Sequence, residues 1–274
     1  MLGAIIGDIV GSIYEFDNIK TKEFDFFTDE MFFTDDTVMT IAIADAIMNG
    51  GQHENFIQSM KKWGNNYIDK SYGGSFRNWL TSETSEPYNS WGNGSAMRVS
   101  PCGWVAKLDI PIEEGIKQTE ELAKMSAEVT HNHPEGIKGA QVTALSIYYM
   151  RHGKSKNDVN EYKYILKNEI EKRYRYNLNF TLDRIRSSYT FNESCQGTVP
   201  QAIVSFLESR NFEDAIRNAI SIGGDSDTLA AITGSIAEAA YGIPETIKEK
   251  AMSYLDDEIK ELYNKWTNYI NSIH

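Results

Sequence analysis

Two segments of this 274-residue chain are apolar on nearly every side when they are read at the helical period. Their sequences are DTVMTIAIADAIMN at residues 36–49 and DTLAAITGSIAEAAY at residues 227–241. A helix that lacks a polar face has to be enclosed by other elements of the fold. Both segments therefore predict helices at the centre of a helical core, and this requirement restricts the architecture more than any other feature of the sequence.

Helical periodicity also dominates the rest of the chain. Residues 2–14 carry an apolar stripe, and Gly3, Gly7 and Gly11 lie at intervals of four on another side, where a neighbouring backbone can approach closely. The β-like runs are few and short. A long loop is expected over 15–33, and loops with helix starts are expected over 70–100. We predict one all-α domain over residues 1–274. Its other helices are expected at 53–69, 111–128, 134–151, 198–208 and 211–221, and from Pro244 to near Ile270. The charged stretch 154–190 is expected to contain a solvated helix.

The overall charge excludes some classes of partner. The chain has 27 basic and 39 acidic residues, a formal net charge of −12. This balance argues against a broad basic surface for nucleic acid or anionic membranes, although a local site can still accept an anionic substrate.

No run approaches the roughly 18 apolar residues of a membrane span. The apolar start contains Asp8 and lacks a basic region, so it predicts a core helix and not a signal peptide. Cys102 and Cys195 are far apart, which favours reduced thiols and a cytoplasmic protein.

Two acidic clusters stand at the starts of the two central helices. They are Thr34-Asp35-Asp36-Thr37 and Asp225-Ser226-Asp227-Thr228. Helix capping alone would explain either cluster, because Asp and Thr at a helix N-terminus accept backbone N–H bonds. A cap needs only one acceptor, however, and adjacent carboxylates repel one another where they are partly buried. If the two N-termini converge, four aspartates and the threonine hydroxyls can hold two divalent cations, and such hard oxygen ligands suit magnesium, manganese or calcium better than zinc.

Other segments can join these clusters. Asp8 and Glu15 are seven residues apart and so share one helical face, although Glu15 can equally be an exposed residue at a helix end. The glycine turn at Gly92-Asn93-Gly94-Ser95 can bring backbone N–H groups to an anion such as a phosphate, and Ser71–Ser75 is a weaker candidate of the same kind. His131 and His133 lack further nitrogen or sulfur ligands for zinc. A hydrogen bond from His131 to a phosphate or ribose oxygen is the better interpretation.

These motifs together resemble the ADP-ribosylglycohydrolase family. This family includes the glycohydrolase that reactivates ADP-ribosylated dinitrogenase reductase and the animal ADP-ribosyl-acceptor hydrolases. The matching residues occur in order at Gly7-Asp8, Gly11 and Glu15, at Thr34–Thr37, at Gly92–Arg98, at Thr130-His131 and at Gly223–Thr228. Each motif alone is weakly specific, but the ordered set extends over nearly the whole chain.

The resemblance implies a fold and a set of site residues. The implied fold is an orthogonally packed all-α bundle with two Mg²⁺ or Mn²⁺ ions at helix N-termini. The implied metal ligands are Thr34, Asp35, Asp36, Asp225, Asp227 and Thr228, with Glu15 beside the metals on a mobile loop. The implied contacts to the diphosphate and distal ribose are Gly92, Asn93, Gly94, Ser95, Met97 and His131. Tyr72, Trp91 and Tyr149 are the candidates to cover the adenine.

The implied reaction releases ADP-ribose from an ADP-ribosylated protein or other acceptor by hydrolysis at C1″ of the distal ribose. Metal ions would orient the ring and activate water, and Glu15 or Asp36 would serve as the catalytic acid or base. Two alternatives remain open: a phosphohydrolase that cuts the diphosphate and releases AMP, and a non-catalytic relative that binds ADP-ribose. The acceptor is not encoded in the motifs, and we expect a monomer because the site needs only one chain.

Overall fold

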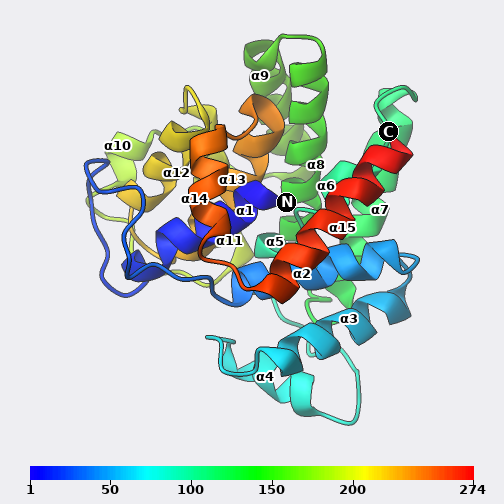
Figure 1. The fold of residues 1–274 in the computed structure, drawn as a ribbon. Helices are drawn as coiled ribbons and strands as arrows, with labels where there is room; N and C mark the ends of the chain where they lie inside the picture. The colour runs from blue at the N-terminus through cyan, green and yellow to red at the C-terminus, as the bar shows by residue number, and fades with distance from the viewer.

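A computed structural model describes all residues from 1 to 274, and it consists of helices and loops without a β-strand (Figure 1). The predicted all-α class is therefore confirmed. The α-helices are α1 (Leu2–Gly11), α2 (Asp35–Met48), α3 (His53–Asn66), α4 (Gly74–Thr81), α5 (Gly94–Met97), α6 (Cys102–Val105), α7 (Ile112–Glu128), α8 (Pro134–Ser155), α9 (Val159–Glu169), α10 (Leu182–Ile185), α11 (Cys195–Leu207), α12 (Phe212–Ser221), α13 (Ser226–Tyr241), α14 (Glu245–Met252) and α15 (Asp257–Ile273). A 3₁₀ turn at Ser12–Tyr14 extends α1, and a π-turn at Ile170–Tyr174 extends α9.

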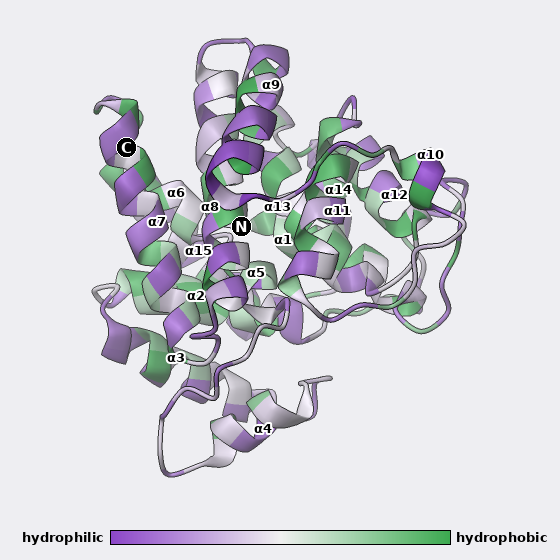
Figure 2. Cartoon of the chain, turned by 180° about the vertical axis from the view of Figure 1, so that it is seen from behind, coloured by the Kyte–Doolittle hydropathy of each residue, from purple (hydrophilic) through white to green (hydrophobic).

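The two helices without a polar face lie at the centre, as predicted. In α13 every residue from Ser226 to Ala237 is buried, and in α2 every residue from Asp36 to Ile47 is buried. No helix of the chain is both long enough and apolar enough to cross a bilayer. Figure 2 shows the contrast with peripheral helices such as α7 and α15, where hydrophilic and hydrophobic residues alternate along the ribbon.

The glycine stripe of α1 packs directly against α13. A Cβ atom on Gly3 would lie 2.2 Å from the carbonyl oxygen of Gly234, and one on Gly7 would lie 2.0 Å from that of Ala230. A Cβ on Gly11 would lie 2.4 Å from Cα of Asp227. The backbones of the two helices are thus in contact (Figure 1), and the contact ends beside the acidic start of α13.

Asp8 connects α1 to the start of α2. Its buried carboxylate accepts hydrogen bonds from the backbone N–H groups of Thr34, at 2.9 Å, and Thr37, at 3.1 Å. It also accepts from both threonine hydroxyls. The two backbone N–H groups belong to the N-terminus of α2, where they have no partner within the helix. Asp8 therefore fixes the position of α2, and both of its carboxylate oxygens are occupied by these hydrogen bonds.

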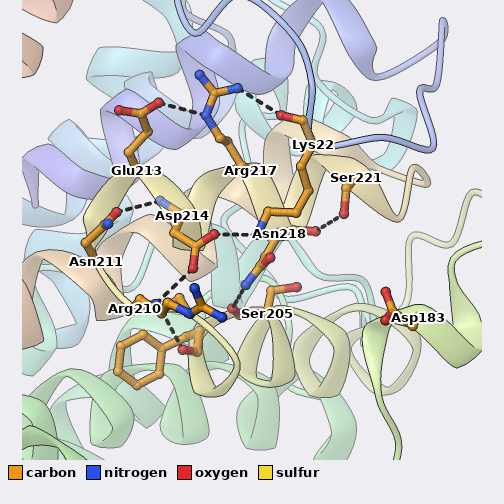
Figure 3. A network of polar contacts seen from close by, with 12 residues as sticks. Lys22, Asp183, Ser205, Arg210, Asn211, Glu213, Asp214, Arg217, Asn218 and Ser221 are labelled. Atoms are coloured by element: carbon orange, nitrogen blue, oxygen red, sulfur yellow. Dashed lines mark hydrogen bonds and ion pairs between the residues drawn. The ribbon is translucent and has the colours of Figure 1, made fainter.

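The loop between Tyr14 and Asp35 is held on the surface by polar contacts. Asn18 donates to the carbonyl oxygen of Gly224, at 2.8 Å, and accepts from its N–H, at 2.7 Å. Lys22 pairs with Asp214 of α12, and Arg217 donates to the carbonyl oxygens of Lys22 and Phe24, at 3.0 and 2.7 Å. Figure 3 shows this network, which holds the loop against α12. Glu15, at the start of the loop, is thereby kept beside α13.

Three expectations about the outer helices need correction. The last helix is two helices, because Asp256 caps a new start by accepting the N–H of Ile259 at 3.0 Å. The segment 70–100 contains α4, whose Phe76 and Trp79 are buried. The charged stretch is not a fully solvated helix, since Leu166 and Ile170 are buried against the core.

Candidate active site

The N-termini of α2 and α13 meet and bring the acidic clusters together. Carboxylate oxygens of Glu15, Asp225 and Asp227 lie within 4.8 Å of one another. The hydroxyl of Thr228 donates to Oδ2 of Asp36 at 3.4 Å, which links the two helix starts directly. Asp35 lies beside Asp36 in the first turn of α2 and lines the same cleft.

The cluster carries more negative charge than its protein neighbours compensate. Burial, followed by repulsion from Asp225 and other acids, raises the pKa of Glu15 to about 8. Burial and the charge of Asp8 raise the pKa of Asp35 to about 7, and burial raises the pKa values of Asp36 and Asp227 well above their usual range. None of these carboxylates forms an ion pair with Lys or Arg.

The donor set fits divalent cations. Oδ1 of Asp36 is buried and has no hydrogen-bond partner, which is costly for an ionised carboxylate unless a cation contacts it. All the neighbouring candidates offer oxygen atoms, the ligands that Mg²⁺ and Mn²⁺ prefer. Asp35, Asp36, Asp225, Asp227 and Thr228 line the cleft with Glu15. Thr34 lies beneath it, where its hydroxyl donates to Asp8 and accepts from the N–H of Asp36.

A cleft of about 320 Å³ opens over this cluster. Most of the residues expected to bind substrate line it, and the second glycine-rich turn contributes to its wall. The lining residues are Glu15, Asp35, Asp36, Ser71, Gly73, Gly74, Ser75, Phe76, Tyr88, Ser90, Gly92, Asn93, Gly94, Met97, His131, Phe191, Glu193, Asp225, Asp227 and Thr228.

Part of the glycine turn is already engaged in hydrogen bonds within the protein. The N–H of Gly92 donates to Oγ of Ser90, at 3.1 Å, and that of Asn93 donates to the carbonyl oxygen of Glu193, at 2.7 Å. The side chain of Asn93 donates to Oδ2 of Asp225 at 2.7 Å. These two backbone donors are thus already used, and the turn orients a carboxylate of the acidic cluster.

Several expected contact residues lie outside the cleft. Ser95 is buried and donates to the carbonyl oxygen of Gly136 at 2.6 Å, so it joins α5 to α8. Tyr72 and Tyr149 are buried in the core and do not line the cleft. Trp91 is 51% exposed and also does not line it. None of the three aromatic residues chosen from the sequence faces this cleft.

Sequence reasoning missed other lining residues. Phe76, Tyr88 and Phe191 supply the aromatic part of the wall, and Glu193 adds a further acid near Glu15 and Asp225. Phe191 stacks on the exposed Phe16 with a centroid distance of 6.1 Å. Helical periodicity does not indicate Tyr88, Phe191 or Glu193, because these residues lie in loops. For the aromatic residues, the available signal was their position in stretches rich in Gly, Ser and Asn.

Comparison with known proteins places this geometry in a family. The family model described as ADP-ribosylglycohydrolase matches residues 1–271. The chain belongs to the ADP-ribosylglycohydrolase family. The motifs that carried the resemblance, at Glu15, Thr34–Thr37, Gly92–Arg98, His131 and Gly223–Thr228, all lie in or beside one cleft.

Named relatives of the family cover most of the chain. ADP-ribosylhydrolase ARH3 of Xenopus tropicalis is 26% identical, with 94% of this chain and 91% of the relative covered. ADP-ribosylarginine hydrolase Tri1 of Pseudomonas putida is 26% identical, with 97% and 77% covered. A solved structure described as an ADP-ribosylglycohydrolase-related protein complex superposes with a TM-score of 0.65 at 21% identity, covering 95% of this chain and 93% of that one. The structural match supports the fold.

Proposed function

We propose that this ADP-ribosylglycohydrolase family member hydrolyses the bond at C1″ of an ADP-ribosyl group and releases ADP-ribose from its acceptor. The observation that carries the proposal is the buried, unpartnered Oδ1 of Asp36 within a cluster of uncompensated carboxylates that opens into a cleft. Such a cluster is unfavourable by itself and becomes favourable when cations and a polar substrate occupy it. Family membership supports ADP-ribosyl transfer to water as the reaction class.

Asp35, Asp36, Asp225, Asp227 and Thr228 would hold two Mg²⁺ or Mn²⁺ ions, with Thr34 as a further ligand. When bound, such ions polarise the hydroxyl groups of the distal ribose and lower the pKa of water. Asn93 orients Asp225 through its amide, and Asp8 orients Asp35 and Asp36 through the backbone of α2. The protein thus fixes the carboxylates in place before the substrate arrives.

Glu15 is our choice for the residue that moves a proton. Its carboxylate lines the cleft, forms no hydrogen bond with the protein and is only partly buried, so a water molecule or a leaving group can reach it. Asp36 is the alternative, but it lies deeper, at 3% exposure. Glu15→Gln should lower kcat by at least about 100-fold while Mg²⁺ binding persists, whereas Asp36→Asn should reduce both.

The rest of the cleft suits a nucleotide. We propose that His131 contacts the diphosphate or the distal ribose and that Phe76, Tyr88 or Phe191 stacks on the adenine. These rings replace Tyr72, Trp91 and Tyr149 as adenine candidates because they line the cleft. One chain supplies the whole cleft, so the proposal needs no second copy, and two free buried cysteines, Cys102 and Cys195, fit the proposed cytoplasmic location.

Product analysis tests the proposal. ADP-ribosyl-arginine, ADP-ribosyl-serine and ADP-ribosylated DNA and RNA are incubated with the protein in Mg²⁺ and in Mn²⁺. Release of intact ADP-ribose from any of them, lost in Asp36→Ala and Asp227→Ala, is the expected result. AMP as the product would indicate a phosphohydrolase instead. Binding of ADP-ribose with no turnover on any substrate would indicate a non-catalytic binder, and retained activity in both variants would overturn the assigned site.

A further inference from the structure

His131 is connected to a buried arginine through one hydroxyl group. The guanidinium of Arg98, which is 1% exposed, donates from Nη2 to Oγ1 of Thr130 at 2.8 Å and to the carbonyl oxygen of Ser126 at 3.2 Å. Oγ1 of Thr130 lies 2.8 Å from Nδ1 of His131. No carboxylate pairs with Arg98, so its positive charge remains beneath this wall of the cleft.

The direction of these hydrogen bonds follows from the chemistry of the donors. A guanidinium can only donate, so the oxygen of Thr130 accepts from Arg98. Thr130 has one hydroxyl hydrogen, and Nδ1 of His131 is the only acceptor it contacts. If Nδ1 carried a proton instead, the hydroxyl hydrogen would be buried without a partner, which is unfavourable. Nδ1 is therefore the acceptor and is unprotonated.

The other ring nitrogen faces the glycine turn. Nε2 of His131 forms no hydrogen bond with the protein, and a Cβ atom on Gly94 would lie 3.1 Å from it. A Cβ on Gly92 would lie 3.6 Å from it. The missing side chains at these two positions leave space beside Nε2 within the cleft.

We propose that Arg98 and Thr130 are positioning residues that fix His131 as the neutral tautomer with hydrogen on Nε2, so that it donates to an oxygen atom of the ligand. For the identity of that ligand, ADP-ribose, the proposal rests on the proposed function. Burial and the charge of Arg98 lower the pKa of His131 well below its usual range, which keeps the ring uncharged at neutral pH. In this tautomer the N–H group at Nε2 can donate a hydrogen bond to an acceptor atom of the ligand, such as a phosphate or ribose oxygen, but cannot accept one.

The tautomer is measured in the ligand-free protein by two-bond ¹H–¹⁵N correlation spectra of the histidine rings, with His131→Gln identifying the signal. We expect a protonated Nε2 and an unprotonated Nδ1 at pH 7. Thr130→Val should convert this pattern to a mixture or to the other tautomer, and Thr130→Ser should restore it. The matched control is Thr143→Val, since Thr143 is also fully buried but its hydroxyl has no partner. A protonated Nδ1 or an imidazolium in the unsubstituted protein overturns the proposal.

Titration calorimetry with ADP-ribose tests the donor role. Thr130→Val should weaken binding several-fold, while Thr130→Ser and Thr143→Val should bind as the unsubstituted protein does. Equal affinity in Thr130→Val and Thr143→Val overturns the donor role even if the tautomer is as expected. Failure of the unsubstituted protein to bind ADP-ribose would overturn the proposed function and the ligand assignment, and the spectra would still decide the tautomer separately.

Discussion

Asp35→Asn should make the cation-free protein more stable, although it replaces a residue of the candidate active site. The ionised Asp35 is surrounded by Asp8, Asp36 and Asp225, and its pKa is raised from 3.8 to about 7. A pKa difference of this size corresponds to about 4 kcal/mol of unfavourable free energy for the charged form at pH 8. Because water reaches part of the side chain, we expect a gain of about 2–4 kcal/mol.

The sign and the pH dependence of this gain are fixed by linkage. A raised pKa in the folded state means that ionisation of Asp35 destabilises the fold. The resulting loss of stability grows as the pH rises from the pKa in the unfolded state toward the pKa in the folded state. The gain from Asp35→Asn should therefore be about half as large at pH 5.5 as at pH 8. At about 2–4 °C per kcal/mol for a chain of this size, Tm at pH 8 should rise by roughly 4–16 °C in chelator.

The matched control is Asp45→Asn on the same helix. Asp45 is buried, and its carboxylate accepts from Nε1 of Trp63, at 2.8 Å, and from Nζ of Lys62, at 3.2 Å. Removing that charge should destabilise the protein by about 1–3 kcal/mol. In saturating Mg²⁺ the advantage of Asp35→Asn should shrink or disappear, because the variant lacks a ligand. If Asp35→Asn instead lowers Tm in chelator at pH 8, as Asp45→Asn should, the cluster is not repulsive and our reasoning is wrong.

Three further results are expected from thermal denaturation. Gly7→Ala should destabilise the protein by about 2 kcal/mol or more, since the new Cβ would lie 2.0 Å from the carbonyl oxygen of Ala230. The control Gly73→Ala should be nearly neutral, because no heavy atom lies within 4 Å of a Cβ at that position. Equal effects of the two substitutions would contradict the packing of α1 on α13. Asp256→Ala removes the cap of α15 and should cost about 1 kcal/mol; no change would mean that α15 starts without it. Saturating Mg²⁺ at about 100 times its Kd should add about 2.7 kcal/mol per ion at pH 8. The gain should be smaller at pH 5.5, where protons compete with the ions for proposed ligands such as Asp35; an equal effect in Asp36→Ala would place the ions elsewhere.

The amino-acid sequence alone determined the class of fold and the position of the acids along it. Helices without a polar face at 36–49 and 227–241 require burial, and the four-residue glycine spacing in α1 predicts the close backbone contact that α13 makes. Local periodicity and composition are sufficient for such inferences, because the spacing of apolar and small residues along one helix indicates which of its sides is buried or closely approached. Periodicity failed for the C-terminal helices. The amphipathic spacing of apolar residues continues there, although a new helix starts at the cap formed by Asp256.

Only the tertiary structure decided which side chains share the cleft. The sequence places Asp8 and Glu15 on one helical face and does not distinguish them. In the structure Asp8 accepts four hydrogen bonds from Thr34 and Thr37, whereas Glu15 lies beside Asp225 and Asp227. Phe191 and Glu193 enter the cleft from a loop that has no periodic signal. The physical reason is that the cleft is assembled from segments far apart in the chain, and their relative placement depends on how α1, α2 and α13 pack, which no local pattern specifies.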